Sequence, residues 1–527
     1  MSSEPEYRPE PEEPCLGDEG VEPAATEDSA AGESAQARGA LGPHRLHPAA
    51  MIIAALRSVR QWAGAAAIPG VAALFGGGLR PVTIFLVLIG LCLLVVGASV
   101  WGFLSWRATT YRVSGGAFYL RRGVLQKSER TIPLDHVQSV DTVQGVVQRL
   151  FGVVELRVET AGGGVEESDA SLAALSRASA AELRRALEGG RAEPAEREEP
   201  GPREVRRLRA RELLVAGATS GQIGVALSVV AVGSQLFDEF FTEGFVRRLY
   251  EALAPSSVVA ILAGLLALGL FAWLLAIAGT VLAYSGFTLS RDEDYLYIRR
   301  GLLEKREATI PLARIQAVQV VEGVLRQPFG LAMLRVESAG YGGSDSGVST
   351  TLFPLLPRRA VPEFLGQAAP EFSGSLPEKP LQRPPRRALR RYVFRSVAPI
   401  ALLLAVAAVP FYLSDLSVPT GVYLAAALLV AGSGLLGWLR YRDAGWGYSG
   451  DCLVLRSRAL ARTTALAPRR RLQSRGSVTN PLQRRASLAH LRVRVASGSG
   501  GAEFGVEDLE DRDVRDLIPR LGPARRP

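Results

Sequence analysis

The strongest chemical signal in this sequence is a concentration of arginine near its C-terminus. Between Leu453 and Ala502 there is no acidic residue, while eleven positions are arginine. Two clusters are the densest, and they consist of Arg469, Arg470, Arg471, Arg484 and Arg485. Basic side chains near an anionic leaflet contribute about 1 kcal/mol each to binding. The pattern predicts a surface that docks on anionic lipid or on an acidic partner, such as the chain's own N-terminal tail. A solvated basic surface without a specific partner is the alternative.

No set of residues predicts catalysis. The sequence lacks a His-Glu-x-x-His zinc motif, a Gly-x-Ser-x-Gly nucleophile motif, a phosphate-binding loop and a dinucleotide fingerprint. Gly162–Gly164 is not followed by the Lys-Ser/Thr pair of a phosphate loop. The three cysteines and four histidines have no metal-ligand spacing. We therefore expect no enzyme activity, no cofactor and no metal site.

The arginine-rich segment is the third copy of a sequence that occurs twice before it. Residues 299–312 (RRGLLEKREATIPL) repeat residues 121–134 (RRGVLQKSERTIPL), and the match continues without a gap to Gly162 and Gly340. The third copy is diverged, because Arg458 replaces the repeat glycine although Pro468 is kept. A fixed offset over a whole segment indicates duplication. We therefore expect three related modules.

Alternating polar and apolar residues in each module predict half-buried strands. A helix with one apolar face should close each module. The residues expected on this face are Ala180, Leu183 and Leu187 in the first module, and Val514, Leu517, Ile518 and Leu521 in the third.

Apolar segments precede each module and are long enough to cross a bilayer. We expect six transmembrane helices in three hairpins, at about 62–79, 81–106, 213–236, 256–284, 396–413 and 420–439. The run 62–79 is broken by Pro69, so whether it fully spans stays open. None of the six contains an acidic or basic side chain, which ion-coupled carriers need at membrane depth. Gly217 with Gly221, and Ala260 with Gly264, have the small-residue spacing of closely packed helices.

The distribution of charge predicts the orientation. Arginines flank the module ends of each hairpin, whereas the hairpin loops carry little positive charge. Both termini and all three modules should therefore face the cytoplasm of a bacterial plasma membrane. Only three of the 61 basic residues are lysine, which is typical of a GC-rich bacterial genome. The net charge of +9 is explained by the membrane flanks, so we expect the lipid bilayer, and no nucleic acid, as a partner.

The repeated Arg-Arg-Gly turn, the Ile-Pro-Leu motif and the block from Phe151-Gly152 to Leu156–Glu159 resemble the bacterial pleckstrin-homology-like (PH-like) domain of the YdbS/YdbT-type (DUF304) membrane proteins. The resemblance covers everything after the N-terminal tail. It implies an α+β fold in which each antiparallel β domain is closed by a C-terminal helix. It supplies no reaction, because fold does not fix function. It does suggest work with a shorter membrane protein of the same family, or self-association, in envelope homeostasis or stress response.

The expected division of the chain follows. It comprises a disordered acidic tail (1–42), an interfacial helix with the first span pair (43–108), the first PH-like domain (109–189), a linker (190–211), the second span pair (212–285), the second PH-like domain (286–369), a Pro/Arg-rich linker (370–394), the third span pair (395–441) and the diverged basic PH-like domain (442–527). The function we expect is non-catalytic, with the PH-like domains as binding or assembly platforms. The alternative is a transporter or flippase-like carrier with PH-like regulatory domains.

Overall fold

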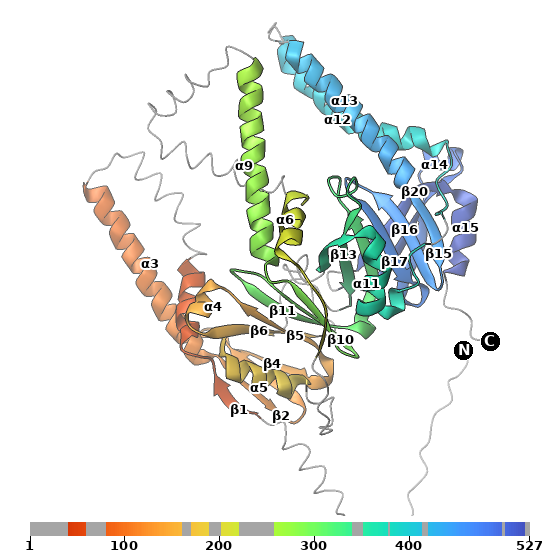
Figure 1. Ribbon diagram of the computed structural model, residues 1–527. Coiled ribbons are helices and arrows are strands. Elements are labelled where there is room, and N and C mark those ends of the chain that lie inside the picture. The colour runs from red at the N-terminus through yellow and green to blue at the C-terminus, as the bar shows by residue number, and fades with distance from the viewer. Residues whose placement is uncertain are drawn as a thin grey trace, which may run out of the picture.

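The computed structural model describes residues 41–59, 81–160, 170–188, 202–220, 258–339, 351–377, 380–413, 420–497 and 501–521. Layered antiparallel sheets form the body of the molecule, and long helices project from one side of it (Figure 1). The expected acidic tail lies outside the described residues except for its last two positions.

The long helices are α3 (Pro81–Ala108), α9 (Val258–Tyr284), α12 (Ala388–Leu413) and α13 (Thr420–Asp443). Within the described residues these four helices, and not six, are long and apolar enough to cross a membrane. The expected span 62–79 lies outside the described residues, and so does 213–236 beyond Ser220. The first part of the expected span 213–236 belongs to α6 (Ala210–Ala218), which packs against α9. The expectation of six helices is thus corrected to four for the described part of the chain.

The first module consists of two sheets and a closing helix. The first sheet has the order β1 (Leu41–Arg45), β2 (Thr110–Ser114), β3 (Ala117–Arg122) and β4 (Ser128–Pro133). The second half of the module contains β5 (Val137–Gln144), α4 (Val146–Leu150), β6 (Val153–Thr160) and β7 (Ala170–Ser176). Helix α5 (Arg177–Glu188) then buries Ala180, Leu183 and Leu187, which confirms the predicted apolar face.

Most of this order returns in the other two modules, although among the described residues the second has no helix between β12 and β13 and the third has no named strand before α12. The second contains β8 (Arg203–Arg207), β9 (Thr288–Arg291), β10 (Tyr295–Arg300), β11 (Lys305–Pro311), β12 (Ile315–Glu322), β13 (Leu331–Ser338), β14 (Thr351–Pro357) and α11 (Val361–Ala368). The third contains β15 (Gly445–Ser449), β16 (Cys452–Arg458), β17 (Arg462–Pro468), β18 (Leu472–Val478), α14 (Pro481–Arg485), β19 (Leu488–Val495), β20 (Ala502–Glu510) and α15 (Asp511–Arg520). Val514 and Leu517 on α15, and Leu521 directly after it, are buried, and Ile518 packs beside them, as predicted.

The repeat glycine is explained by a tight turn between β3 and β4 and between β10 and β11. Gly123 and Gly301 have φ values of +108° and +102°, and a Cβ on either would lie 1.9 Å from a carbonyl oxygen of the same turn. Only glycine fits such a position without strain. In the third module β16 extends to the equivalent Arg458. The lost glycine therefore marks a turn of different shape, and Arg458 is free to take another role there.

Each module includes chain from before its helical hairpin. Strand β1 pairs with β2, and β8 pairs with β9, although the spans lie between the members of each pair in sequence. In the third module an isolated bridge joins Gln382 to Trp446 across α12 and α13. The ranges 190–211 and 370–394, expected as linkers, thus contribute backbone pairing to the modules that follow them. The two ends of each span pair meet at one sheet.

Strand pairing also crosses from module to module. Strand β5 of the first module pairs with β11 of the second, which gives the sheet order β7-β6-β5-β11-β10-β9-β8. Strand β12 of the second module pairs with β17 of the third, which gives the order β14-β13-β12-β17-β16-β15. Both junctions have the same register: Gln144 pairs with Lys305, and the equivalent Glu322 pairs with the equivalent Arg462. The three modules are therefore joined by continuous sheets, and one core cluster includes Val454 and Leu466 of the third module with residues of the second.

Candidate functional site

The five arginines predicted as a docking surface do not form one free basic patch. Arg470 and Arg471 each contact a carboxylate oxygen of Glu371, which follows the second module's closing helix. Arg469 lies over the ring of Tyr448 and donates to the backbone carbonyl of Arg520. Arg484 and Arg485 end α14 and are exposed, and no ion pair joins them to any described residue. These last two make no described ion pair, and Arg470 is paired but keeps 65% of its side chain exposed.

Acidic residues outside the window Leu453–Ala502 balance much of its charge. Glu503 on β20 pairs with Arg492 and Arg494 on β19 at 3.3 and 2.9 Å. Asp443, the last residue of α13, pairs with Arg458. A count along the sequence misses these neighbours because they come from adjacent strands and from another module. Docking on anionic lipid through Arg469–Arg471 stays a prediction. These three side chains already contact Glu371 or the Arg520 carbonyl.

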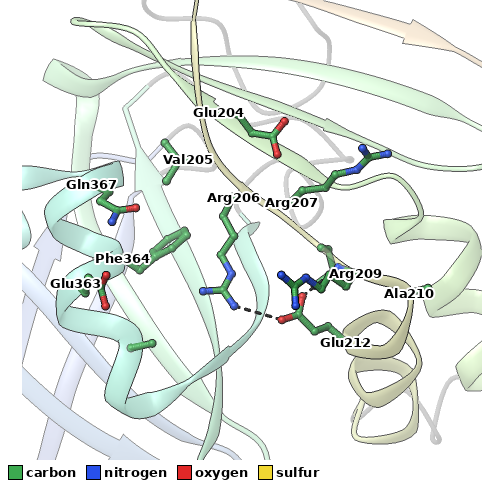
Figure 2. A pocket seen from close by; sticks show the side chains of 12 residues that line it. Glu204, Val205, Arg206, Arg207, Arg209, Ala210, Glu212, Glu363, Phe364 and Gln367 are labelled. Atoms are coloured by element: carbon green, nitrogen blue, oxygen red, sulfur yellow. Dashed lines mark hydrogen bonds and ion pairs between the residues drawn. The ribbon is translucent and has the colours of Figure 1, made fainter.

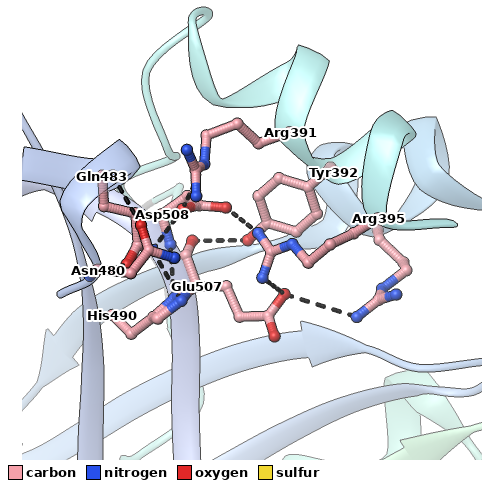
Figure 3. Close-up of polar contacts among 9 residues, drawn as sticks. Arg391, Tyr392, Arg395, Asn480, Gln483, His490, Glu507 and Asp508 are labelled. Atoms are coloured by element: carbon pink, nitrogen blue, oxygen red, sulfur yellow. Dashed lines mark hydrogen bonds and ion pairs between the residues drawn. The ribbon is translucent and has the colours of Figure 1, made fainter. Parts of the chain in front are cut away.

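A buried aspartate ties the third hairpin to the third module (Figure 3). Asp508 on β20 is fully buried, and Arg391 and Arg395 reach it from the first turns of α12. The Arg391 Nε lies 3.2 Å from Asp508 Oδ1, and the Gln483 side chain donates to the same oxygen at 2.7 Å. The backbone of Asp508 has a φ of +51°, in the left-handed region that aspartate tolerates better than most residues. The site thus places two cationic groups of the hairpin on one carboxylate.

Neighbouring residues extend this network to both helices of the hairpin (Figure 3). The Tyr392 hydroxyl donates to the Glu507 carbonyl at 2.6 Å. The Glu507 carboxylate pairs with Arg395 of α12 at 2.9 Å and with Arg440 of α13 at 3.5 Å. The His490 ring lies 2.7 Å from the Gln483 amide, and burial lowers the pKa of His490. Movement of α12 or α13 would therefore displace side chains that are bonded to β19 and β20.

A second network joins the second module, the third module and the end of α13. Arg462 on β17 donates to both carboxylate oxygens of Glu322 on β12, at 2.7 and 2.6 Å. Glu322 is only 2% exposed, and this bidentate bond is the main reason why the pKa of Arg462 is raised. Arg462 also lies 3.6 Å from Asp443, which contacts the buried Arg458. We call these four residues the seam network.

A pocket of about 750 Å³ lies between the β8–α6 segment and α11 (Figure 2). Its charged residues are Glu204, Arg206, Arg207, Arg209, Glu212 and Glu363. Arg206 points toward Glu212, and their charged groups are 3.2 Å apart. Three arginines against three glutamates leave no net charge to select an ionic ligand.

The described residues also show where possible metal ligands and the charged groups of the long helices lie. They contain no group of three or more His, Cys, Asp and Glu side chains that could hold a metal. In α3, α9, α12 and α13, acidic and basic side chains occur only in the terminal turns, such as Arg107, Arg395 and Arg440. The small-residue spacing noted at Gly217 lies in a real contact, because a Cβ there would be 3.1 Å from Ile277 of α9. Gly221 lies outside the described residues, and the surroundings of Ala260 and Gly264 are not described either.

Sequence reasoning did not find Asp508, Glu322 or Asp443. Two weak signals were present: Arg458 at a position that is glycine in the other copies, and an acidic pair, Glu507-Asp508, in a strand that should be half buried. Neither signal names its partner. Glu322 and Arg462 are 140 residues apart in sequence, so only the folded chain brings them together.

Comparisons with known proteins agree with this architecture. The model of the family described as Bacterial PH domain matches residues 53–191, 241–370 and 400–522, which together make up most of the chain. The UPF0699 transmembrane protein YdbT of Bacillus subtilis (strain 168) is 34% identical over 496 residues, which cover 90% of this chain and 97% of that protein. No solved structure matches the chain.

Proposed function

The chain belongs to the bacterial PH domain family, and we propose that it is a non-catalytic protein of the bacterial plasma membrane whose three modules act together as one binding or assembly platform. The modules and both termini face the cytoplasm in this proposal. The partners we propose are a shorter membrane protein of the same family or a second copy of the chain. The process is envelope homeostasis or stress response.

The observation that carries this proposal is the pairing of β5 with β11 and of β12 with β17. Independent ligand-binding domains on flexible linkers would not need shared sheets. Joined modules instead present their surfaces in a fixed spacing, which is what a platform requires. The seam network and the Asp508 network fix this platform to the ends of α12 and α13.

Two features support a single cytoplasmic face. The pairing of β1 with β2 and of β8 with β9 brings both ends of each hairpin to the same sheet, so the chain returns to the side on which it began. Arg107, Arg395 and Arg440 lie at the module ends of their helices, as the positive-inside rule expects for cytoplasmic ends. The carrier alternative is not supported by the described spans, whose midsections contain no acidic or basic side chain.

Orientation can be tested with single cysteines on the three closing helices. In a chain whose own Cys15, Cys92 and Cys452 are replaced, Glu182→Cys, Glu363→Cys and Asp516→Cys would be placed singly. All three positions are exposed. We expect a membrane-impermeant maleimide to label each one only after the cells are permeabilised. Labelling of any of them in intact cells would contradict the cytoplasmic placement.

The platform itself can be tested by breaking the junction between the second and third modules. Glu322→Arg places a cation against Arg462, whereas Glu363→Arg makes the same change on the exposed face of α11. The proteins would be cross-linked in intact cells, and the variants compared at equal membrane abundance. We expect the cross-linked complexes of the wild-type chain with its partner protein to persist in Glu363→Arg and to be lost in Glu322→Arg. Adducts that are indifferent to the junction, or no adducts in the wild type, would contradict a joint platform.

A further inference from the structure

A second pocket, of about 790 Å³, lies at the seam between the second and third modules. Its walls come from β12, β13 and α11 of the second module, from the segment after α11, and from β16 and β17 of the third. The cross-module pairing of β12 with β17 therefore creates it. Neither module alone would contain it.

The charge of this seam pocket is unlike that of the pocket beside α6. It is lined by Arg358, Arg359 and Arg456 against one acidic residue, Glu322. The Glu322 carboxylate already accepts hydrogen bonds from Nε and Nη2 of Arg462, and the Arg358 guanidinium lies 3.6 Å from it. No ion pair joins Arg359 to any described residue. The pocket thus has positive charge in excess of what the chain itself neutralises.

Arg456 lies deepest among these cations. Its Nε donates to the hydroxyl of Thr464 at 3.1 Å, which leaves its charge unneutralised by that contact. Burial, and then the nearby Arg358 and Arg462, lower the pKa of Arg456, while Glu322 and Asp443 oppose the shift. An anion in the pocket would offset the cost of burial, because it would pair with the half-buried guanidinium of Arg456. It would also offset the repulsion from Arg358 and Arg462.

The remaining wall is apolar. Val320, Leu331 and Leu376 line the pocket, and Phe329 lies at it with 72% of its surface exposed. The exposed ring of Phe329 beside the arginines offers an apolar surface that a hydrocarbon chain can cover. The pocket therefore combines an anion site with a surface for a hydrocarbon chain.

The seam pocket also lies close to α6 and to the module end of α13. The turn that carries Phe329 includes Arg326, whose side chain donates to the Ala216 carbonyl of α6 at 3.2 Å and to the Thr219 hydroxyl at 3.2 Å. On its other side Glu322 belongs to the seam network, which ends at Asp443 of α13. A ligand in the pocket would lie beside Glu322, which the seam network connects to the end of α13.

We propose that the seam pocket binds the phosphate headgroup of an anionic phospholipid from the adjoining leaflet, with Arg359 and Arg456 on the phosphate and Phe329 against the lipid's apolar part. This inference deepens the proposed platform by naming a ligand class. It moves lipid recognition away from Arg469–Arg471, whose guanidinium groups contact Glu371 and the Arg520 carbonyl.

The test uses the full chain purified in a neutral detergent. Short-chain phosphatidylglycerol, short-chain phosphatidylcholine and inorganic phosphate would be titrated separately, and the melting temperature followed, because a ligand of the folded state raises it. We expect phosphatidylglycerol alone to give a large, saturable rise. A matching rise with phosphatidylcholine would overturn the anion site, and an equal rise with inorganic phosphate at the same concentration would overturn the lipid and leave a free phosphate ligand.

Three variants locate the site. Arg359→Gln with Arg456→Gln should weaken phosphatidylglycerol binding by more than about tenfold, and Phe329→Ser should weaken it while leaving any phosphate response unchanged. Arg484→Gln with Arg485→Gln removes two exposed arginines of the third module and should bind normally. If binding survives in the first variant, or is lost in the third, the seam pocket is not the site. The cysteine labelling above does not depend on this result, so the two proposals fail separately.

Discussion

At the scale of single residues, Asp508 has the clearest structural task. A carboxylate that is fully buried must be paired, because an isolated charge in the interior is very costly. Here the pairing groups are Arg391 and Arg395, which enter from the membrane hairpin. Asp508 therefore fixes the position of the first turns of α12 relative to the third module.

Replacing Asp508 by Asn should test this task. Asparagine keeps the shape and tolerates the left-handed backbone, but it leaves Arg391 without its counter-charge and Arg395 with Glu507 alone. We expect the free energy of unfolding to fall by about 3 kcal/mol, measured by denaturant titration in mixed micelles. The control is Asp511→Asn, which removes an i,i+4 pair with the exposed Arg515 and an acidic group from the first turn of α15, and should cost less than about 1 kcal/mol. Equal losses in the two variants would contradict the role given to Asp508.

His490 should make stability depend on pH. Burial lowers its pKa in the folded chain, with Arg395 and Arg492 acting in the same direction, while the nearby Asp508 and Glu507 oppose the shift. As the pH falls below the ordinary value of 6.5, the unfolded chain binds a proton that the folded chain does not. Stability is therefore full above that value and decreases below it.

The measurement is the melting temperature of the full chain between about pH 7.5 and pH 5.5. We expect the decrease on acidification to be smaller in His490→Gln than in the wild type. His136→Gln removes an exposed histidine and should leave the wild-type decrease unchanged. A decrease that is the same in all three chains would show that His490 does not titrate in the way its surroundings require.

At the scale of elements, the third hairpin depends on the close approach of α12 and α13. A Cβ on Gly437 of α13 would lie 2.7 Å from the Val393 Cα and 2.9 Å from the Tyr392 carbonyl oxygen of α12. Small residues allow helix backbones to meet in a membrane, where the hydrophobic effect does not drive them together. This contact is next to Tyr392 and Arg395, so it also positions the groups that hold Glu507 and Asp508.

Gly437→Ala should force the two helices apart. We expect a loss of about 1–3 kcal/mol in the free energy of unfolding, typical of overpacking, and faster amide exchange in the first turns of α12. Gly432→Ala is the matched control, because no atom lies within 4 Å of its added Cβ. That change should be neutral or stabilising, since alanine is the better helix former. If Gly437→Ala behaves like Gly432→Ala, the hairpin is not packed at this point.

The elements were the most predictable level of this structure. The repeats gave the modules, and helical periodicity gave the buried faces of α5 and α15, because both signals are local in sequence. Strands β1 and β8 were not expected, since each has only five residues, and Arg203, Arg206 and Arg207 make β8 read as a charged linker. Alternation predicts which face of a strand is buried but not which strand lies beside it. The pairing of β12 with β17 therefore could not be predicted, and neither could Glu322 beside Arg462.

At the scale of the whole molecule, β4 and β18 are equivalent to the strands that join modules, but each lacks a partner from another module in the described part of the chain. In the described part of the chain, β4 pairs only with β3 and β18 only with β19. The valines that β5 and β12 bury at one position, Val140 and Val318, are replaced on β18 by the exposed Arg475. A charge in the middle of an edge strand prevents further pairing. We infer that the third module diverged in part to end the array of modules.

Arg475→Val should restore a pairing edge. We expect the purified chain to shift from its wild-type mass toward larger assemblies in light scattering, because an exposed apolar edge recruits another strand. Arg494→Val makes the same substitution on β19, which lies between β18 and β20 and offers no edge. Its mass should stay at the wild-type value. Assembly in both variants would point to exposed apolar surface in general, and not to the edge.

The most direct test of the joined modules is amide hydrogen exchange of the full chain in a bilayer mimic. Strands β4, β11 and β17 are equivalent in the repeat, but β11 and β17 have neighbours on both sides, whereas β4 has a described neighbour on one side only. We predict slow exchange of the amides in Lys305–Glu307 of β11 and Arg462–Leu466 of β17, which pair with the neighbouring module, and fast exchange of the outward-facing amides of β4. Equal exchange in all three strands would mean that the modules are not joined by shared sheets, and the platform proposed from that pairing would lose its basis.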